Sequence, residues 1–230
     1  MGTRPVTETW ETVRETDGEP VVVVNAHDTD HRHRSDETLL SGATVAVLDA
    51  AATVAELVGA TDVVVLVNEE SAVRGRVEDA VTAVGDTLPV DLEVTVGPAE
   101  YRAGSPTAAL EVLEGNDRIE PRLQPPSPAS HGLFGRPTAV HSVRTVLQVR
   151  AALQRELPEL SPPGDSDETA TERSGGTATD SAGATPTRLF SVTGDIDDPA
   201  VVELPTSGSL ASARGAVTPT DGFQMACVGG

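Results

Sequence analysis

Imidazole and carboxylate side chains gather just after the first strongly apolar segment of the chain. The loop AHDTDHRHRSD follows the run Val21–Asn25, and its titratable side chains are His27, Asp28, Asp30, His31, His33 and Asp36. These groups are ligands that Zn²⁺ or Mn²⁺ accepts. No helical context in this segment would place two imidazoles on one face of a helix. We therefore interpret the cluster as a solvated polar loop and predict no metal site.

Nucleophilic catalysis is a second chemistry to consider. The pairs Ser130-His131 and His141-Ser142 each join a hydroxyl to an imidazole, but no G-x-S-x-G elbow surrounds either serine. The single cysteine, Cys227, has no histidine near it in sequence, so we interpret it as an inert or interfacial thiol. One cysteine also excludes an intramolecular disulfide and any cluster held by several thiolates of this chain. No catalytic residue is assigned.

Alternating strands and helices must position these groups. Continuous β-branched runs predict buried strands at Val21–Asn25 and Asp62–Val67, and an alternating run predicts an edge strand at Asp91–Val96. Apolar residues at helical spacing predict helices at Ala43–Val58 and Arg74–Val84. This order indicates the α/β class, with right-handed crossovers.

The remaining N-terminal part contains one ambiguous segment and one long loop. Thr9–Val13 is interpreted as a short edge strand or a loop. Gly97–Thr145 holds a short helix at Thr107–Glu114 and then more than twenty residues rich in Pro, Gly and Ser, which indicates a functional loop. A helix is predicted at Val143–Leu157. Four spaced apolar residues predict that the loop packs onto the domain: Leu123, Leu133, Phe134 and Val140.

The C-terminal third differs in composition. Residues 158–186 have almost no apolar content and are predicted to be a disordered acidic linker between a domain at 1–157 and a module at 187–230. Within the module, Arg188–Gly194 and Ala200–Leu204 predict a strand pair, and Leu210 starts a short helix or turn. The last residues are apolar and end in Gly-Gly, so we expect the module to be truncated.

The charge balance is strongly acidic. The 230 residues include 36 Asp and Glu against 16 basic residues, all of them Arg, for a formal net charge of −20. Self-repulsion of this size is screened by concentrated salt, so we expect a halophilic, haloarchaeal-like protein. The same field disfavours binding to nucleic acid. No charged-then-apolar leader and no membrane-spanning apolar run is recognised, so the protein is expected to be cytoplasmic.

A long gapless set of residues in the loop carries a family resemblance. The matching positions include Tyr101, Gly104, Thr107-Ala108, Leu113-Glu114-Gly115, Pro121-Arg122-Leu123, Pro125-Pro126, Gly132-Leu133, Gly135, Pro137-Thr138, Val140, Val143 and Thr145. In this register the chain resembles the FMN- and NADH-binding F-type (51 kDa-type) subunit of NADH-quinone oxidoreductase, complex I. Asn25-Ala26 followed by Asp28 resembles that family's Asn-Ala-Asp-Glu segment.

The resemblance implies a flavin-binding α/β sandwich domain followed by a small β-grasp module. Leu189–Gly194 with Glu203-Leu204-Pro205 is similar to the opening of the family's soluble-ligand-binding (SLBB-like) β-grasp. The implied cofactors are FMN and NAD, and the implied partners are a small thioredoxin-like subunit or other electron-transfer subunits. The implied cofactor-binding positions are Asn25, Asp28, Tyr101, Gly104, Val140, His141 and Ser142.

Several positions depart from the family pattern. The stretch Gly2–Thr7 keeps one glycine of the family's phosphate-binding loop, where backbone amides must crowd an anion. Ser105 and Pro106 replace the family's acidic pair, and His141 and Ser142 replace its paired asparagines. The four cluster cysteines have no counterparts, so no iron–sulfur cluster is expected in this chain.

Two functions are compatible with this pattern. The first is a divergent NADH-oxidising subunit that passes electrons from NADH through a flavin. The alternative is a non-catalytic binding or assembly module that has lost the flavin and NADH site. The exchanged acidic pair, glycines and cysteines favour a protein without full NADH dehydrogenase activity.

Overall fold

The computed structural model describes residues 5–28, 32–156 and 187–220, which belong to two compact units with a boundary after Glu156. The predicted linker at 158–186 and the segment with Cys227 lie outside the described residues. Each unit is considered by itself below.

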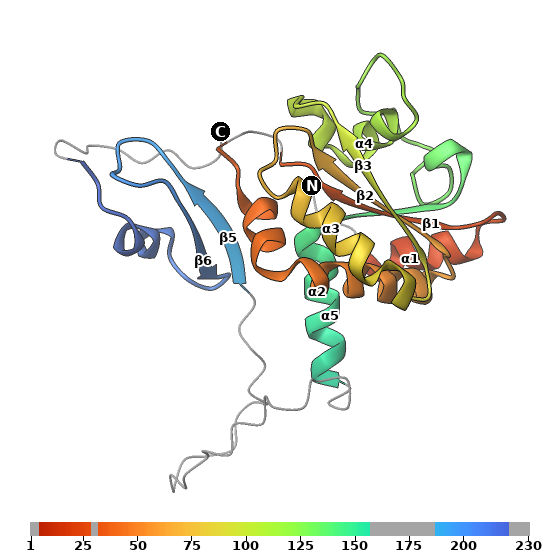
Figure 1. The fold of residues 1–230 in the computed structure, drawn as a ribbon, viewed down its shortest axis with the longest axis horizontal. Coiled ribbons are helices and arrows are strands. Elements are labelled where there is room, and N and C mark those ends of the chain that lie inside the picture. Colours follow the sequence, from red (N-terminus) through yellow and green to blue (C-terminus); the bar gives the residue numbers. More distant parts are fainter. Residues whose placement is uncertain (1–4, 29–31, 157–186, 221–230) are drawn as a thin grey trace, which may run out of the picture. The chain divides into compact units, whose positions relative to one another are not determined.

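Unit 1 is built on a parallel sheet with the strand order β3-β2-β1-β4 (Figure 1). The strands are β1 (Val21–Ala26), β2 (Asp62–Asn68), β3 (Asp91–Gly97) and β4 (Thr138–Ser142). Val21 pairs with Asp62 of β2 on one side and with Thr138 of β4 on the other. The predicted edge position of β3 is confirmed. Strand β4 forms the opposite edge and was not predicted from the sequence.

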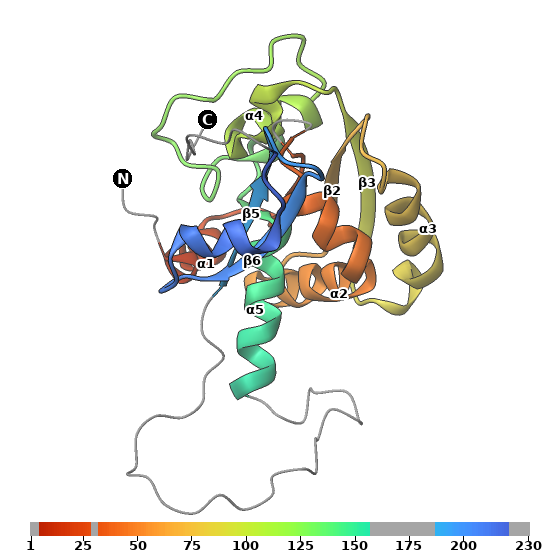
Figure 2. The same ribbon diagram turned by 90° about the vertical axis from the view of Figure 1, so that its left-hand side faces the viewer.

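Five α-helices in the described part of unit 1 accompany the sheet. They are α1 (Val6–Glu15), α2 (Ser35–Val58), α3 (Arg74–Val84), α4 (Pro106–Leu113) and α5 (Val143–Glu156). Helices α2 and α5 lie side by side in both ribbon views (Figures 1 and 2). The interpretation of Thr9–Val13 as a strand or loop was wrong, because these residues form the middle of α1. Helix α2 begins before the predicted Ala43, where non-helical backbone angles mark a kink.

The two faces of the sheet are covered differently. Val22 and Val24 of β1 belong to the large core shared with α2, α3 and α5, whereas Val21 and Val23 pack with Leu110 of α4. This alternation follows from the two-residue period of a strand. The continuous valine runs are therefore explained by burial on both faces, as parallel sheets require.

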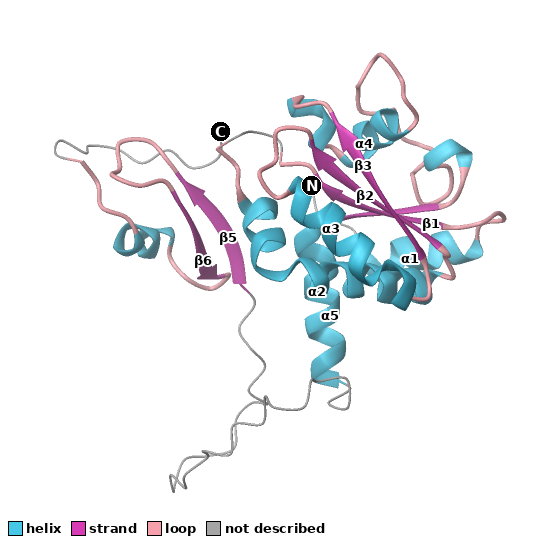
Figure 3. Cartoon of the chain, in the orientation of Figure 1, coloured by secondary structure: helices cyan, strands magenta, loops and turns pink. Residues whose placement is uncertain are grey.

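The chain reverses direction across the sheet at β1. From β1 it advances through α2 to β2 and through α3 to β3, then returns through α4 on the other face to β4 beside β1 (Figure 3). The carboxyl ends of β1 and β4 therefore flank a topological switch point. In open α/β sheets, ligands bind in the crevice outside such a point.

Helix α2 has the length and composition of a membrane span, which corrects the expectation that no such run exists. Within unit 1, however, ten of its residues are buried by the sheet and the neighbouring helices. An apolar core helix satisfies the same criteria of length and composition. Its C-terminal end is set by Gly59, whose positive φ of 77° allows its N–H to bond the last carbonyls.

Unit 2 contains the predicted strand pair. Strands β5 (Thr187–Val192) and β6 (Ala200–Pro205) are antiparallel, and the 3₁₀ helix η5 (Leu210–Ala216) follows. Val202 and Leu204 are buried. The assignment of this unit to the β-grasp type stays a prediction.

Candidate functional site

A cavity of about 170 Å³ lies at the carboxyl ends of β1 and β4, which is the switch point of the sheet. Its lining consists of Asn25, His27, Asp28, His33, Asp36, Gly104, Pro106, Val140, His141 and Ser142. Six of the seven cofactor-binding positions that the family resemblance implies are among them. Tertiary structure thus brings together the end of β1, the start of α4 and the end of β4.

Tyr101, the seventh position, lines a neighbouring cavity of about 510 Å³. Its side chain is 70% exposed. The two cavities share Asp28 and His33, so they adjoin at the end of β1. Cavities that bind organic ligands enclose roughly 300–1,000 Å³. The smaller cavity is below that range, but the two together are within it.

Asn25 fixes the turn that closes one side of the first cavity. Its Nδ2 donates to the carbonyl oxygens of Ala103 and Gly104 at 3.4 and 3.1 Å, and its Oδ1 accepts from the N–H of His27 at 3.1 Å. Ala103 and Gly104 belong to the 3₁₀ helix η2 (Tyr101–Gly104). The Asn25 amide therefore holds Gly104 at the cavity wall.

His27 corrects the interpretation of its segment as a solvated loop. Its side chain is only 3% exposed, and its Nε2 lies 2.8 Å from the carbonyl oxygen of Pro98, beyond the end of β3. Its Nδ1 is buried and has no hydrogen-bond partner among the described residues. The exposed His33 does fit the earlier interpretation. Among the described residues, no cluster of metal-ligating side chains is found.

His141 of β4 is paired with Trp10 of α1. The indole Nε1 donates to His141 Nε2 at 2.9 Å, and the rings meet edge to face at 6.1 Å between centroids. Burial lowers the pKa of His141 to about 4, so this imidazole is neutral at physiological pH. Sequence reasoning missed Trp10, because 131 positions separate it from its partner.

Two carboxyl groups border the same cavity. Asp28 accepts hydrogen bonds from the N–H groups of Asp36 and Glu37 at 3.2 and 3.0 Å, so it caps the start of α2. Burial raises the pKa of Asp28, although these bonds oppose the rise. Burial and the neighbouring Asp28 charge raise the pKa of Asp36 to about 7, against the attraction of Arg144.

The pKa of Asp36 predicts a pH-dependent stability. Between its ordinary pKa of 3.8 and about 7, the folded state binds more protons than the unfolded state, so stability falls as pH rises through this range. The variant Asp36→Asn removes the group, and we expect it to be about 1–3 kcal/mol more stable relative to the original chain at pH 8 than at pH 5. Denaturant titrations at both pH values measure this difference. The exposed Asp79→Asn variant is the control, and an equal response of the two variants would contradict the assignment.

Ser142 connects the cavity to the start of α5. Its Oγ accepts from the N–H of Thr145 at 3.2 Å and lies 3.0 Å from the Thr145 hydroxyl. This contact caps the helix in the way that serine favours. Ser142 therefore has a structural role besides lining the cavity.

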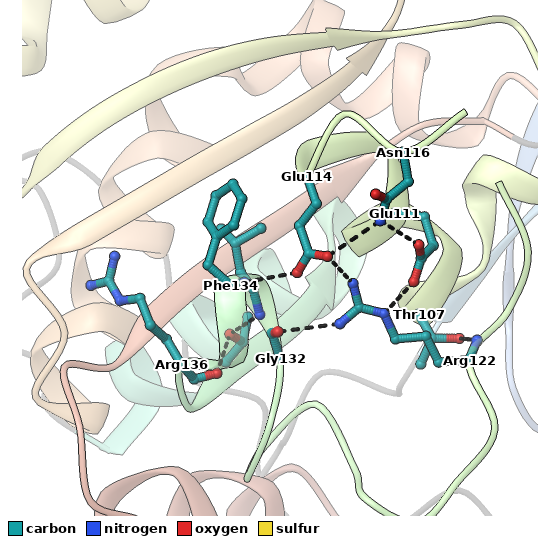
Figure 4. Close-up of polar contacts among 10 residues, drawn as sticks. Thr107, Glu111, Glu114, Asn116, Arg122, Gly132, Phe134 and Arg136 are labelled. Atoms are coloured by element: carbon teal, nitrogen blue, oxygen red, sulfur yellow. Dashed lines mark hydrogen bonds and ion pairs between the residues drawn. The ribbon is translucent and has the colours of Figure 1, made fainter. Parts of the chain in front are cut away.

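The long loop between α4 and β4 is held by Arg122 (Figure 4). Its guanidinium pairs with Glu111 and, at 2.5 Å, with Glu114, and it donates to the carbonyl oxygen of Gly132 at 3.2 Å. Glu114 also accepts from the N–H of Phe134 at 2.8 Å. The guanidinium of Arg122, in the middle of the loop, thus connects α4 with the end of the loop at Gly132.

The loop packs down less completely than its apolar residues predicted. Leu133 is buried beside Val21 and Val23, and Val140 is partly buried there. Leu123 is 93% exposed and Phe134 is 69% exposed, so the prediction was wrong for these two residues. The ion-pair network of Arg122 provides the anchoring that we expected from them.

Ser105 and Pro106 mark the start of α4, where the sequence departs from the family's acidic pair. Ser105 is the N-cap residue and Pro106 occupies the first turn, a position that suits proline because its missing N–H has no helical partner. Pro106 lines the first cavity. The wall at this point is therefore uncharged.

Comparison with known proteins agrees with this arrangement. The family model described as Nuo51 FMN-binding domain matches residues 2–151. The F-type subunit of NADH-quinone oxidoreductase from Aquifex aeolicus (strain VF5) is 34% identical over 127 residues, which are 55% of this chain and 26% of that protein. An F-type subunit of NADH-quinone oxidoreductase from Rhizobium meliloti (strain 1021) is 30% identical over 157 residues, 62% of this chain and 35% of that protein.

A solved structure shows the same similarity in three dimensions. A chain of NAD⁺-reducing [NiFe]-hydrogenase in the H₂-reduced state aligns with a TM-score of 0.72 and 26% identity, over 94% of this chain and 36% of that chain. The present chain thus spans about a quarter to a third of the length of the curated relatives and the solved chain. The family model covers more than half of the chain and the fold is shared, so the chain belongs to the Nuo51 FMN-binding domain family.

Proposed function

We propose that unit 1 binds FMN at the carboxyl ends of β1 and β4, with the flavin ring in the 170 Å³ cavity and its remaining part in the adjoining one. The observation that carries the proposal is the convergence of six implied cofactor-binding positions on the topological switch point. The residues that would hold the cofactor are Asn25, Asp28, Tyr101, Gly104, Val140, His141 and Ser142.

The chemistry of the cavity wall fits a flavin ring. The wall combines hydrogen-bonding groups with the apolar Val140 and Pro106, and it contains one buried nitrogen, His27 Nδ1, that has no partner in the described part of the protein. Buried polar atoms are paired in the great majority of cases, so an unpaired one supports a ligand at this position. Half of the stretch Gly2–Thr7, which resembles the family's phosphate-binding loop, lies outside the described ranges.

We further propose that the chain acts in electron transfer from NADH. Bound FMN supplies hydride acceptance and single-electron release, and the protein supplies binding and orientation. The nicotinamide ring would stack on Tyr101, since an exposed aromatic ring offers a flat stacking surface. The partners would be electron-transfer subunits, including a small thioredoxin-like one, and the site of action would be the cytoplasm.

A visible absorption spectrum tests the proposal. The protein is purified in multimolar KCl, titrated with FMN, and separated from free ligand. We expect close to one flavin per chain, and NADH should bleach the flavin band if the NADH site also functions. The variant Val140→Trp, which would fill the cavity from β4, should abolish binding, whereas Val45→Trp on the exposed side of α2 should not. Absence of bound flavin in the original chain would reject the proposal.

The uncharged wall at Ser105 and Pro106 favours a second candidate function, a binding or assembly module without NADH oxidation. In that case the chain would bind a partner subunit but would show neither a flavin band nor bleaching by NADH. The same spectrum therefore decides between the two functions.

A further inference from the structure

Phe134 has a backbone conformation that a bulky residue rarely adopts. Among the described residues it is the only one besides glycines with a positive φ, and its φ and ψ are 50° and 34°. A large side chain makes this left-handed conformation unfavourable, whereas glycine adopts it freely. The ring is 69% exposed, so packing on this chain offsets little of the strain. Neither the backbone nor the core of unit 1 therefore accounts for a phenylalanine at this position.

The turn that carries Phe134 is fixed by hydrogen bonds. Each N–H from Gly132 to Arg136 donates to an acceptor of the chain, three of them within the turn at 2.8–3.0 Å. The N–H of Phe134 itself donates to Glu114 at 2.8 Å, and the ring takes no part in the contacts drawn in Figure 4. A ring on a fixed backbone loses little freedom when it is bound, as an interface anchor requires.

The loop around Phe134 lacks the acidic groups that the chain carries elsewhere. None of the 36 acidic residues lies between positions 121 and 155. In the part at 121–137, both arginines are partly buried and paired, Arg122 with Glu114 and Arg136 with Asp62. The exposed residues of this part are therefore free of carboxylates and guanidinium groups. Six of them define what we call the Phe134 patch: Leu123, Gln124, Pro125, Pro126, His131 and Phe134.

We propose that the Phe134 patch is a contact surface between two copies of this chain, with the Phe134 ring of each copy against the apolar residues of the other. Two copies that each carry a formal net charge of −20 repel each other, so they approach most easily where acidic groups are missing. An isologous interface places the same surface on both sides of a twofold axis, so a surface without fixed charge is complementary to itself. A partner selected by opposite charge would need exposed carboxylates or arginines, which the patch lacks.

The apolar character of the patch suits concentrated salt. Multimolar salt screens Coulomb attraction, whereas the gain from burying apolar surface persists. Aromatic side chains are enriched in the buried centres of interfaces, which is the place that the proposal gives to Phe134. The patch has fewer residues than the roughly 20–30 on each side of a standard interface, so we expect a weak dimer with a dissociation constant of about 10–100 µM.

Dimerisation at the patch is independent of the proposed flavin site. No residue of the patch lines either of the two cavities described above. The dimer can therefore form whether or not FMN binds, and a failure of one proposal leaves the other standing.

Sedimentation equilibrium of the full chain in multimolar KCl tests the proposal. Between about 5 µM and 500 µM protein, we expect the average mass to rise from that of the 23.7 kDa chain toward twice this value. A monomer at the highest concentration would overturn the proposal, even if a different protein binds the patch. A mass that rises beyond that of a dimer would also overturn it, because a twofold contact closes on itself.

The variant Phe134→Gly separates the contact from folding. Glycine adopts the positive φ without strain, so the melting temperature measured at a concentration below the dissociation constant should not fall. Loss of the ring should weaken dimerisation at least about tenfold. Unchanged dimerisation of this variant would reject the role of Phe134.

A second variant and a control complete the test. Leu123 is 93% exposed, so Leu123→Glu leaves the fold intact, but it places a carboxylate in the apolar contact and should weaken dimerisation at least about fivefold. Val45 of α2 is an exposed apolar residue outside the patch, and Val45→Ala should leave the dissociation constant unchanged within about twofold. Equal losses in Val45→Ala and Phe134→Gly would contradict the assignment of the contact to the patch.

Discussion

We expect the protein to unfold in a cooperative thermal transition in multimolar KCl and to lose this transition in about 0.1 M KCl. The chain carries a formal net charge of −20, and its 2% aromatic content leaves a core of small side chains. The Debye length is about 10 Å at 0.1 M salt and about 3 Å at 1 M, so dilute salt exposes the acidic surface to its own repulsion. We expect a loss of about 5 kcal/mol or more, which is comparable with the whole stability of an ordinary domain.

Circular-dichroism melts at several KCl concentrations measure this effect, and a charge-reduced variant controls it. Five acidic residues are exposed and have no side-chain partner in the described structure: Glu11, Glu56, Asp79, Asp86 and Glu93. Replacing each by its amide changes the formal net charge from −20 to −15. This variant should keep its transition at a lower salt concentration. Identical salt curves for the two proteins would show that the acidity has another role.

The variant Arg122→Met is expected to destabilise unit 1 by about 2–3 kcal/mol. Its guanidinium is 24% exposed, and the partner carboxylates Glu111 and Glu114 are each 17% exposed. Removing the guanidinium leaves two partly buried carboxylates beside each other without a counter-charge. The resulting loss of stability is larger than the net contribution of the Arg122 ion pairs. The loop would also lose its contact with Gly132. Denaturant titration in multimolar KCl gives the difference.

Arg118→Met is the matched control. Arg118 pairs with Glu120 at 3.0 Å, but its side chain is 82% exposed, so we expect a change within about 0.5 kcal/mol. An equal loss in both variants would contradict the anchoring role of Arg122.

Acid titration gives a second signature of Arg122. Burial alone would raise the pKa of Glu114, but the hydrogen bonds from Arg122 and from the Phe134 N–H outweigh it and hold this pKa below 4.5. The resulting stability is complete above pH 4.5 and is lost as pH falls below that value. Arg122→Met should lose this acid dependence, and Arg118→Met should retain it.

The strands and helices of the α/β layer could be predicted from the sequence because each has a distinctive local pattern of apolar residues. The valine runs of β1 and β2 and the helical spacing in α3 are each contained in one short segment, so composition and period identify them. The segment Thr138–Ser142 has no comparable run, and only its pairing with β1 makes it a strand. The N-terminal residues around Trp10 carried no clear strand or helix signal, and packing of Val13 and Trp10 on the core defines α1.

The amino-acid sequence by itself determined the family, the order of strands and helices from β1 to β3 and the residue types at the site. Tertiary structure alone decided that His27 is buried with one nitrogen unpaired among the described residues, that Trp10 donates to His141, and that Tyr101 lines the second cavity. The physical reason is that burial and hydrogen-bond partners depend on residues far away in the chain. The local sequence is the same for a histidine in a solvated loop and for a histidine in a cavity wall. The two are distinguished only in the folded protein, where the sheet brings the ends of β1 and β4 together.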